Sequence, residues 1–427
     1  MFSTLANAWK IPELRKKLMF TMMILLIYRV CSVIPVPFVD GHALSEFYDA
    51  VLSQTVLGLY NAMSGSAFSM ATVLALGIQP YINASIIIQL LTVAIPALER
   101  MAKEEGEEGK KKIERITRYT TVGLGLLLGF GYYTMISSQN ASYGILSDTG
   151  VLAAATIILT FTAGSCFVMW MGEQITEFGI GNGISMILFA NIISGLPAGV
   201  INLWTIGTQT WWIPLVVIVA VAALVLFIVF INDAERRIPI QYAKRVVGRK
   251  IYGGQNTNLP IKVAMSGVMP VIFAQSICSI PATVCAFIPG GTDSTIYKLF
   301  FDPHSWIYFA FYVLMIFFFS WFYSTIQYDP TEISNNLKKN GGFIPGFRPG
   351  KPTADFIQKV INKIVIFGAV YLAVVAGLPI VAGNLMTVVQ NLAIGGTSVI
   401  IVVGVALETV KALEAQMLMR HYKGFLD

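Results

Sequence analysis

The chain has 427 residues, of which 56% are hydrophobic and 12% are charged, and its formal net charge is +6. Soluble domains carry roughly 25% charged residues, so this composition excludes an ordinary soluble protein and indicates one that lies in a bilayer. The four cysteines fall in apolar segments, and the three histidines are scattered without the spacing of a metal motif. We therefore expect no disulfide framework, no metal site and no cofactor.

Windows of about 20 apolar residues predict transmembrane helices. Ten such windows follow one another along the chain, at about residues 18–34, 71–95, 119–137, 151–171, 184–203, 213–231, 263–288, 306–326, 361–382 and 393–410. This pattern predicts an all-α polytopic membrane protein with ten transmembrane helices. They divide into two five-helix halves, 18–203 and 204–412, between an N-terminal arm (1–17) and a C-terminal tail (413–427).

The distribution of basic residues predicts which segments face the cytoplasm. Of the 29 lysines and arginines, all but Arg29 and Lys298 lie in the N-terminal arm, in the loops after windows two, six and eight, in the C-terminal tail, or within three residues of one of these segments. We therefore expect both termini in the cytoplasm and residues 35–70 on the outer side.

Two segments near the N-terminus flank the first window. The N-terminal arm predicts an amphipathic helix on the cytoplasmic surface, whose basic face would contact anionic headgroups. The segment 54–70 is too apolar for a free loop and too short to cross the membrane. Two interpretations of it stay open: a surface helix packed on the outer rim, or a short helix that dips into a cavity beside the second window.

A glycine and a proline three residues apart interrupt the second window at Gly77 and Pro80. The same Gly-x-x-Pro motif recurs in the seventh window at Gly267 and Pro270. Proline has no N–H and its ring crowds the preceding turn, so such a break survives in hydrocarbon only where protein or a water-filled cavity covers it. Five spans is an odd number, so the second half starts from the opposite side of the membrane. Helix breaks at matching places in the two halves therefore indicate an inverted repeat and mark a candidate transport path.

Two long loops, 232–262 and 327–360, are predicted to project into the cytoplasm. The first carries most of its basic residues close together, at Arg236, Arg237, Lys244, Arg245, Arg249 and Lys250. The second ends in a tip framed by proline and glycine that presents Phe347 and Arg348. Membrane topology alone would place charges here, and binding of an acidic or RNA-rich partner would use the same charges. Both interpretations stay open.

Four ordered motifs resemble those of the SecY family, the central subunit of the bacterial protein translocon. They are TVLALGIQPYINASIIIQ from Thr72 to Gln89, GEQITEFGIGNGIS from Gly172 to Ser185, RRIPIQYAKR from Arg236 to Arg245, and PGFRPG from Pro345 to Gly350. The resemblance runs from about Ile11 to the last window, which is essentially the whole chain. It implies a clamshell of two five-helix halves around an hourglass pore.

The resemblance also implies where the working parts lie. A ring of apolar side chains would form the constriction, carried over by motif position to Ile78, Ile82, Ile184, Leu188, Ile272 and Ile401, with Leu188 departing from the usual isoleucine. The segment 54–70 would be the plug that fills the outer funnel. A lateral gate would open between windows two and three and windows seven and eight. Asn83 and Gln275 lie on gate helices, where they would either tune the gate or simply make a hydrogen bond between helices.

The function that the resemblance implies is a protein-conducting channel. It would pass unfolded secretory polypeptides across the bacterial plasma membrane and release transmembrane helices, including signal sequences, sideways into lipid. The implied partners are the small membrane subunits SecE and SecG, the ATPase SecA or a translating ribosome on the cytoplasmic loops, and nascent polypeptides. A secondary transporter with inverted repeats is the alternative, but no carboxylate relay lies at mid-membrane. An enzyme is not expected, because no nucleophile lies beside a base or a metal motif.

Overall fold

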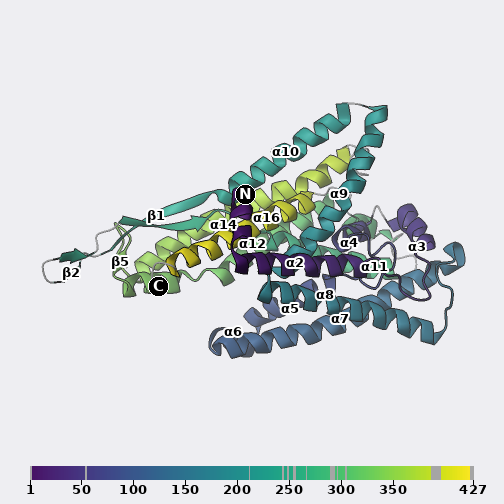
Figure 1. Cartoon of the computed structure of the whole chain (residues 1–427), viewed down its shortest axis with the longest axis horizontal. Helices are drawn as coiled ribbons and strands as arrows, with labels where there is room; N and C mark the ends of the chain where they lie inside the picture. Colours follow the sequence, from purple (N-terminus) through teal and green to yellow (C-terminus); the bar gives the residue numbers. More distant parts are fainter. Residues whose placement is uncertain are drawn as a thin grey trace.

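The computed structural model describes residues 2–52, 55–210, 212–242, 245–247, 250–252, 256–265, 267–288, 294–295, 297–302, 305–385 and 396–423. Most of these residues are helical, and many of the helices run roughly along the long axis of the molecule (Figure 1). A small group of strands projects from one end, beyond the ends of the helices (Figure 1). The all-α polytopic fold class is therefore confirmed, with strands confined to a loop region.

Each of the ten apolar windows falls on a helix. The helices are α2 (Pro12–Cys31), α5 (Gln79–Ala94), α7 (Gly106–Tyr143), α8 (Val151–Phe178), α9 (Gly183–Gln209), α10 (Trp212–Asp233), α11 (Met269–Phe287), α12 (Trp306–Gln327), α14 (Lys351–Leu385) and α16 (Gly396–Lys423). Within the described part of the chain, five of them are long and apolar enough to cross a membrane by themselves, namely α8, α9, α10, α12 and α14. A sixth candidate is α5 together with α6 (Pro96–Lys103), which is bent at 105° from it.

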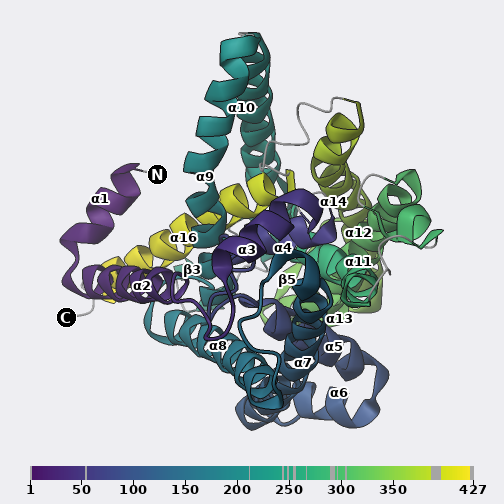
Figure 2. The ribbon, with the colours of Figure 1, turned by 90° about the vertical axis from the view of Figure 1, so that its right-hand side faces the viewer.

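The helices pack into two halves along the chain. In the first half, α5 contacts α7, and α8 contacts α2, α7 and α9. In the second half, α12 contacts α11 and α14, and α16 contacts α10 and α14. The halves meet on one side where α9 contacts α10 and α16, and on the other where α5 and α7 contact α11. We call the second contact the seam. Figure 2 shows α9 and α10 pointing away from the bundle as a pair.

The two Gly-x-x-Pro motifs lie at helix starts, whereas the sequence predicts breaks within longer helices. Helices α5 and α11 begin only at Gln79 and Met269, so the predicted windows 71–95 and 263–288 both open on residues in turns. Gly77 and Gly267 have φ angles of 53° and 58°, in the left-handed region that glycine adopts most readily. The proline that follows each glycine lies in the first turn of its helix, where its missing N–H has no intrahelical partner to lose.

The N-terminal arm is two helices, because Pro12 cannot continue the first one. Helix α1 (Phe2–Lys10) ends before Pro12, and α2 then runs without interruption past residue 17 into the first window. Ala8 and Leu14 are buried with Ile180 and Leu413 in one small cluster. The arm therefore packs against the C-terminal part of α16 as well as lying at the surface.

The two long loops, 232–262 and 327–360, fold together. Strand β1 (Glu235–Tyr242) pairs antiparallel with β4 (Asn256–Lys262) and with β5 (Gly342–Phe343), so strands from both loops share one sheet. A second hairpin joins β2 (Arg245–Val247) to β3 (Lys250–Tyr252). Under the larger sheet lies a cluster of buried apolar side chains that includes Ile238, Ile240, Ile261, Leu337 of α13 (Pro330–Lys339), Ile344 and Ile357. We call this sheet, α13 and the start of α14 the cytoplasmic unit, after the side of the membrane on which the sequence predicts it.

Candidate channel site

The first turns of α5 and α11 place matching isoleucines at the centre of the molecule. The residues that cap these helices, Ile78 and Val268, have similar backbone angles, with φ near −90° in both. The amide N of Ile82 donates to the carbonyl of Ile78 at 3.1 Å, and that of Ile272 donates to the carbonyl of Val268 at 3.3 Å. Ile82 and Ile272 therefore hold equivalent positions, one turn into two helices that belong to different halves.

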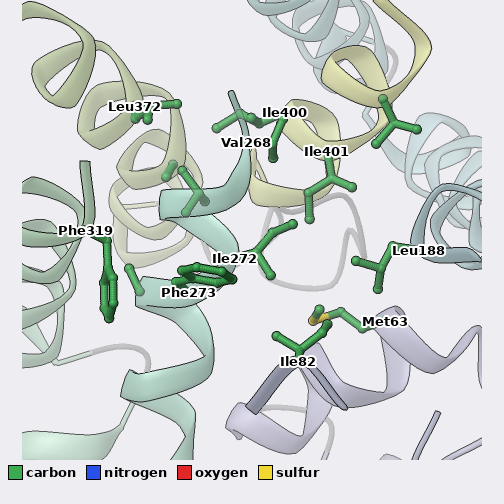
Figure 3. Packing of buried hydrophobic residues seen from close by; sticks show 14 of the residues in the cluster. Met63, Ile82, Leu188, Val268, Ile272, Phe273, Phe319, Leu372, Ile400 and Ile401 are labelled. Carbon is green, nitrogen blue, oxygen red and sulfur yellow. The ribbon is translucent and has the colours of Figure 1, made fainter. Parts of the chain in front are cut away.

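Five of the six residues expected to form the ring are buried in one apolar cluster. Its members include Ile78, Ile82, Leu188, Ile272 and Ile401, all at most 5% exposed. They come from α5, α9, α11 and α16, so both halves contribute. Figure 3 shows Ile82, Leu188, Ile272 and Ile401 pointing toward a common centre.

Ile184 lies at the edge of the same cluster. It is half-buried and packs against the cluster. Its Cγ1 lies 3.5 Å from the point where a Cβ on Gly172 would be. Ile184 therefore leans toward α8, since the glycine leaves room for it there.

The segment 54–70 enters this centre, which supports the second of its two interpretations. Helix α4 (Val56–Ser64) contacts α9 and α11, and its residues Leu57, Tyr60, Met63 and Ser64 are all less than 9% exposed. Figure 3 shows the Met63 side chain reaching between Ile82 and Leu188. Gln79 Nε2 donates to the Met63 sulfur at 3.0 Å. Met63 lies in the segment predicted from the sequence, but no local pattern singles it out, because its contacts come from distant parts of the chain.

The two polar residues that were expected on gate helices are buried near the seam. Asn83 on α5 and Gln275 on α11 are 4% and 6% exposed. The Oδ1 atom of Asn83 has no hydrogen-bond partner. An unpaired buried carbonyl costs free energy, so Asn83 is the position at which an apolar replacement tests the packing of the seam.

Three of the basic residues expected to contact partners lie at the surface of the cytoplasmic unit. Arg236, Arg237 and Arg348 are exposed, and Arg237 pairs with Glu235 at 2.6 Å. Arg245 and Lys250 lie in the β2–β3 hairpin. Lys244 and Arg249 lie outside the described residues.

The tip of the second loop is held in place from within. The ring of Phe347 lies 4.3 Å from that of Phe356, centroid to centroid. The Thr353 hydroxyl donates to the carbonyl of Arg348 at 2.8 Å. The Ser334 hydroxyl likewise donates to the carbonyl of Gly350 at 2.8 Å. The tip therefore presents the Arg348 side chain from a fixed backbone.

A cavity of about 370 Å³ lies beside the start of α11, on the side of the cytoplasmic unit. Its lining includes Lys262, Gly267, Tyr323, Glu408 and Lys411. Lys411 also pairs with Asp233 at 2.7 Å, which ties α16 to the end of α10. In the described part of the chain, no group of three His, Cys, Asp or Glu side chains could hold a metal ion.

A family model described as SecY matches residues 72–410 of the chain. A curated protein from Streptomyces scabiei, named protein translocase subunit SecY, is 43% identical over 440 aligned residues, which cover 100% of both chains. A second, from Thermotoga maritima and of the same name, is 40% identical over 435 residues, covering 100% of this chain and 98% of that one.

Solved structures share the fold at lower identity. A protein-conducting channel has a TM-score of 0.68 at 19% identity and covers 94% of this chain and 92% of its own. A SecY protein, described as having a plug domain that stabilises the closed state of the translocation channel and maintains a membrane seal, has a TM-score of 0.65 at 19% identity with the same coverage. Sec61 in a canine ribosome–channel complex has a TM-score of 0.62 at 18% identity, covering 94% and 92%.

Proposed function

Since the chain belongs to the SecY family, we propose that Ile78, Ile82, Ile184, Leu188, Ile272 and Ile401 form the constriction through which a polypeptide passes. The chain is a multi-pass membrane protein and a protein-conducting translocation channel, and the transporter interpretation is not favoured. The observation that carries the proposal is the convergence of apolar side chains from four helices of both halves (Figure 3).

An apolar constriction suits a channel that must be closed to ions and open to many sequences. A ring of aliphatic side chains excludes water from the narrowest point and so blocks ions. It offers no fixed hydrogen bond that a passing chain would have to break. The branched side chains can also shift outward without leaving a polar group unpaired.

The ring is tested by ion conductance. Replacing Ile82 and Ile272 together with glycine removes two large side chains from the centre, and we expect the conductance of the reconstituted channel to rise several-fold. The control is the double variant Ile87→Gly with Ile280→Gly on the same two helices. It lowers the helix propensity by the same two replacements, but both positions lie outside the buried cluster. Equal conductance in the two double variants would contradict the proposed ring.

We further propose that the segment 54–70 acts as a plug and that the seam is the lateral gate. The burial of α4 against α9 and α11 supports the first proposal. The contact of α5 and α7 with α11 supports the second, because it joins the halves on the side opposite α9 and α10. A segment exposed in an open seam would partition by its hydrophobicity, with leucine-like residues favouring lipid by about 0.3–0.6 kcal/mol each.

Membership of the family also leads to proposals for the membrane in which the channel lies and for the partners that drive translocation. We propose a bacterial plasma membrane, both termini in the cytoplasm, SecE and SecG as membrane partners, and SecA or a ribosome on the cytoplasmic unit, with anionic lipids near the N-terminal arm. A related channel is described with a ribosome, which supports a large cytoplasmic partner. The exposed Arg348 on its fixed tip gives that partner a cationic anchor.

The partner surface is tested by charge reversal at the tip. Arg348→Glu should reduce channel-dependent stimulation of the SecA ATPase, or ribosome binding, at least tenfold, because an anchor becomes a repulsive charge. Lys351→Glu, close in sequence and also exposed, is the matched control for net charge. Undiminished binding and translocation by Arg348→Glu would remove Arg348 from the proposed interface.

A further inference from the structure

Arg29 is an exception to the charge distribution of this chain. It is the one basic residue between Lys17 and Arg100, and it lies near the outer end of α2. Its Nη1 donates to the carbonyl of Gly65 at 3.3 Å. Gly65 is the residue that ends α4 in a left-handed conformation, with φ of 65°. The guanidinium is therefore placed at the C-terminal end of the plug helix.

A second side chain holds the same end of α4. Asn191 of α9 is 1% exposed, and its Nδ2 donates to the carbonyl of Met63 at 2.7 Å and to the Tyr28 hydroxyl at 2.8 Å. Tyr28 is fully buried and precedes Arg29 on α2. Two carbonyls near the end of α4 thus accept hydrogen bonds from neighbouring side chains of α2 and α9.

These contacts meet a physical need of the plug helix. The last carbonyls of any helix lack partners within the helix, and they carry the negative end of its dipole, where a cation is stabilising. Met63 and Ser64, the last two residues of α4, are buried, so the Met63 carbonyl needs a partner from the protein. A Cβ on Gly65 would lie 2.6 Å from Arg29 Nη1 and 3.0 Å from Asn191 Oδ1, so the contact is close enough to require glycine.

We propose that Arg29, Tyr28 and Asn191 form a clasp that holds the plug helix to the first half of the channel. This inference rests on the proposed role of 54–70 as the plug. All three residues belong to α2 and α9, so separating α11 from α5 at the seam leaves the clasp intact. Release of the plug is then a step distinct from opening of the gate, and the clasp sets its equilibrium.

The test measures exposure of the plug directly. A cysteine at Ser64, which is 4% exposed, is introduced after the four native cysteines are replaced by alanine. The rate of its modification by a membrane-impermeant maleimide, added from the outer side of reconstituted vesicles, reports release of α4. We expect Asn191→Leu and Arg29→Gln each to raise this rate about tenfold, and Arg29→Lys to change it less than twofold because the charge remains.

The control is Asn202→Leu, the same substitution at an exposed position of α9, which should leave the rate unchanged. Equal rates in Asn191→Leu and Asn202→Leu, or in Arg29→Gln and Arg29→Lys, would overturn the clasp. If Asn191→Leu fails to assemble, the labelling rates of Arg29→Gln and Arg29→Lys still test the clasp, because Arg29 is only half-buried. Deletion of residues 56–64 tests the plug separately. If the deletion leaves the ion conductance unchanged, the segment is not a plug. If the deletion raises the conductance but the Asn191 and Arg29 variants leave the labelling rate unchanged, the plug stands and only the clasp is refuted.

Discussion

Glycine 77 and glycine 267 decide where the two central helices begin. Each turns the chain through a left-handed residue and lets a helix start at the centre of the molecule. A Cβ on Gly77 would meet nothing closer than Ser64 at 3.8 Å, whereas one on Gly267 would lie 2.9 Å from a Glu408 carboxylate oxygen. The recurrence of the Gly-x-x-Pro motif predicted that the helix is interrupted at both positions. The sequence could not distinguish a kinked helix from a helix start, because proline is compatible with both.

Gly164 shows what the sequence left hidden at this scale. It lies in the middle of α8 with no motif around it, yet a Cβ there would overlap the carbonyl of Val73. The close approach joins α8 to the turns before α5. Only the folded structure brings these two segments together, so no local pattern could have indicated it.

At the scale of single residues, we predict the effect of replacing Asn83. Its buried Oδ1 has no partner, so Asn83→Leu should stabilise the packed seam by about 1–3 kcal/mol. We expect a higher Tm in detergent and slower translocation of substrates whose signal sequences are weakly hydrophobic. A series of signal sequences graded in leucine content measures the second effect. A lower Tm together with an unchanged dependence on hydrophobicity would show that Asn83 does not bias the gate.

The helices followed from composition far better than the loops did. Ten apolar windows each correspond to a helix because hydrocarbon allows few other structures for a spanning segment. The cytoplasmic loops were expected as two separate projections. They form one unit instead, since β5 of the second loop pairs with β1 of the first. The pairing of strands about 100 residues apart has no local signal, and β5 is only 2 residues long.

At the scale of secondary-structure elements, we predict how a core substitution changes the stability of the cytoplasmic unit. Ile240 is 3% exposed beneath the sheet, so Ile240→Ala should destabilise the unit by about 2–4 kcal/mol. We expect faster limited proteolysis of the loops and weaker stimulation of the motor ATPase, with no change in ion conductance. Thr257→Ala is the control, because Thr257 is exposed and opposite Ile240 in the ladder. Equal proteolysis of the two variants would contradict this assignment of the core.

The whole molecule is asymmetric in how its halves are joined. On one side α9 continues along the chain toward α10, and the two project together from the bundle (Figure 2). On the other side, α5 and α7 contact α11 with no chain connection between them. Halves that are covalently linked on one side can separate only on the other. This supports a channel that opens sideways at the seam while α9 and α10 act as the hinge.

The orientation of the whole molecule is the last prediction. Basic residues are confined, apart from Arg29 and Lys298, to segments expected on one side, and this bias sets how membrane proteins insert. Single cysteines at Asn7, Ala50 and Asn340, all at exposed positions, are placed in a chain whose native cysteines are replaced by alanine. A membrane-impermeant maleimide should label only Ala50→Cys in right-side-out vesicles, and only Asn7→Cys and Asn340→Cys in inverted vesicles. The reverse pattern would invert the channel and place the cytoplasmic unit beyond the reach of any cytoplasmic motor, whereas the expected pattern places Arg29 and the clasp at the outer side, where the plug is released.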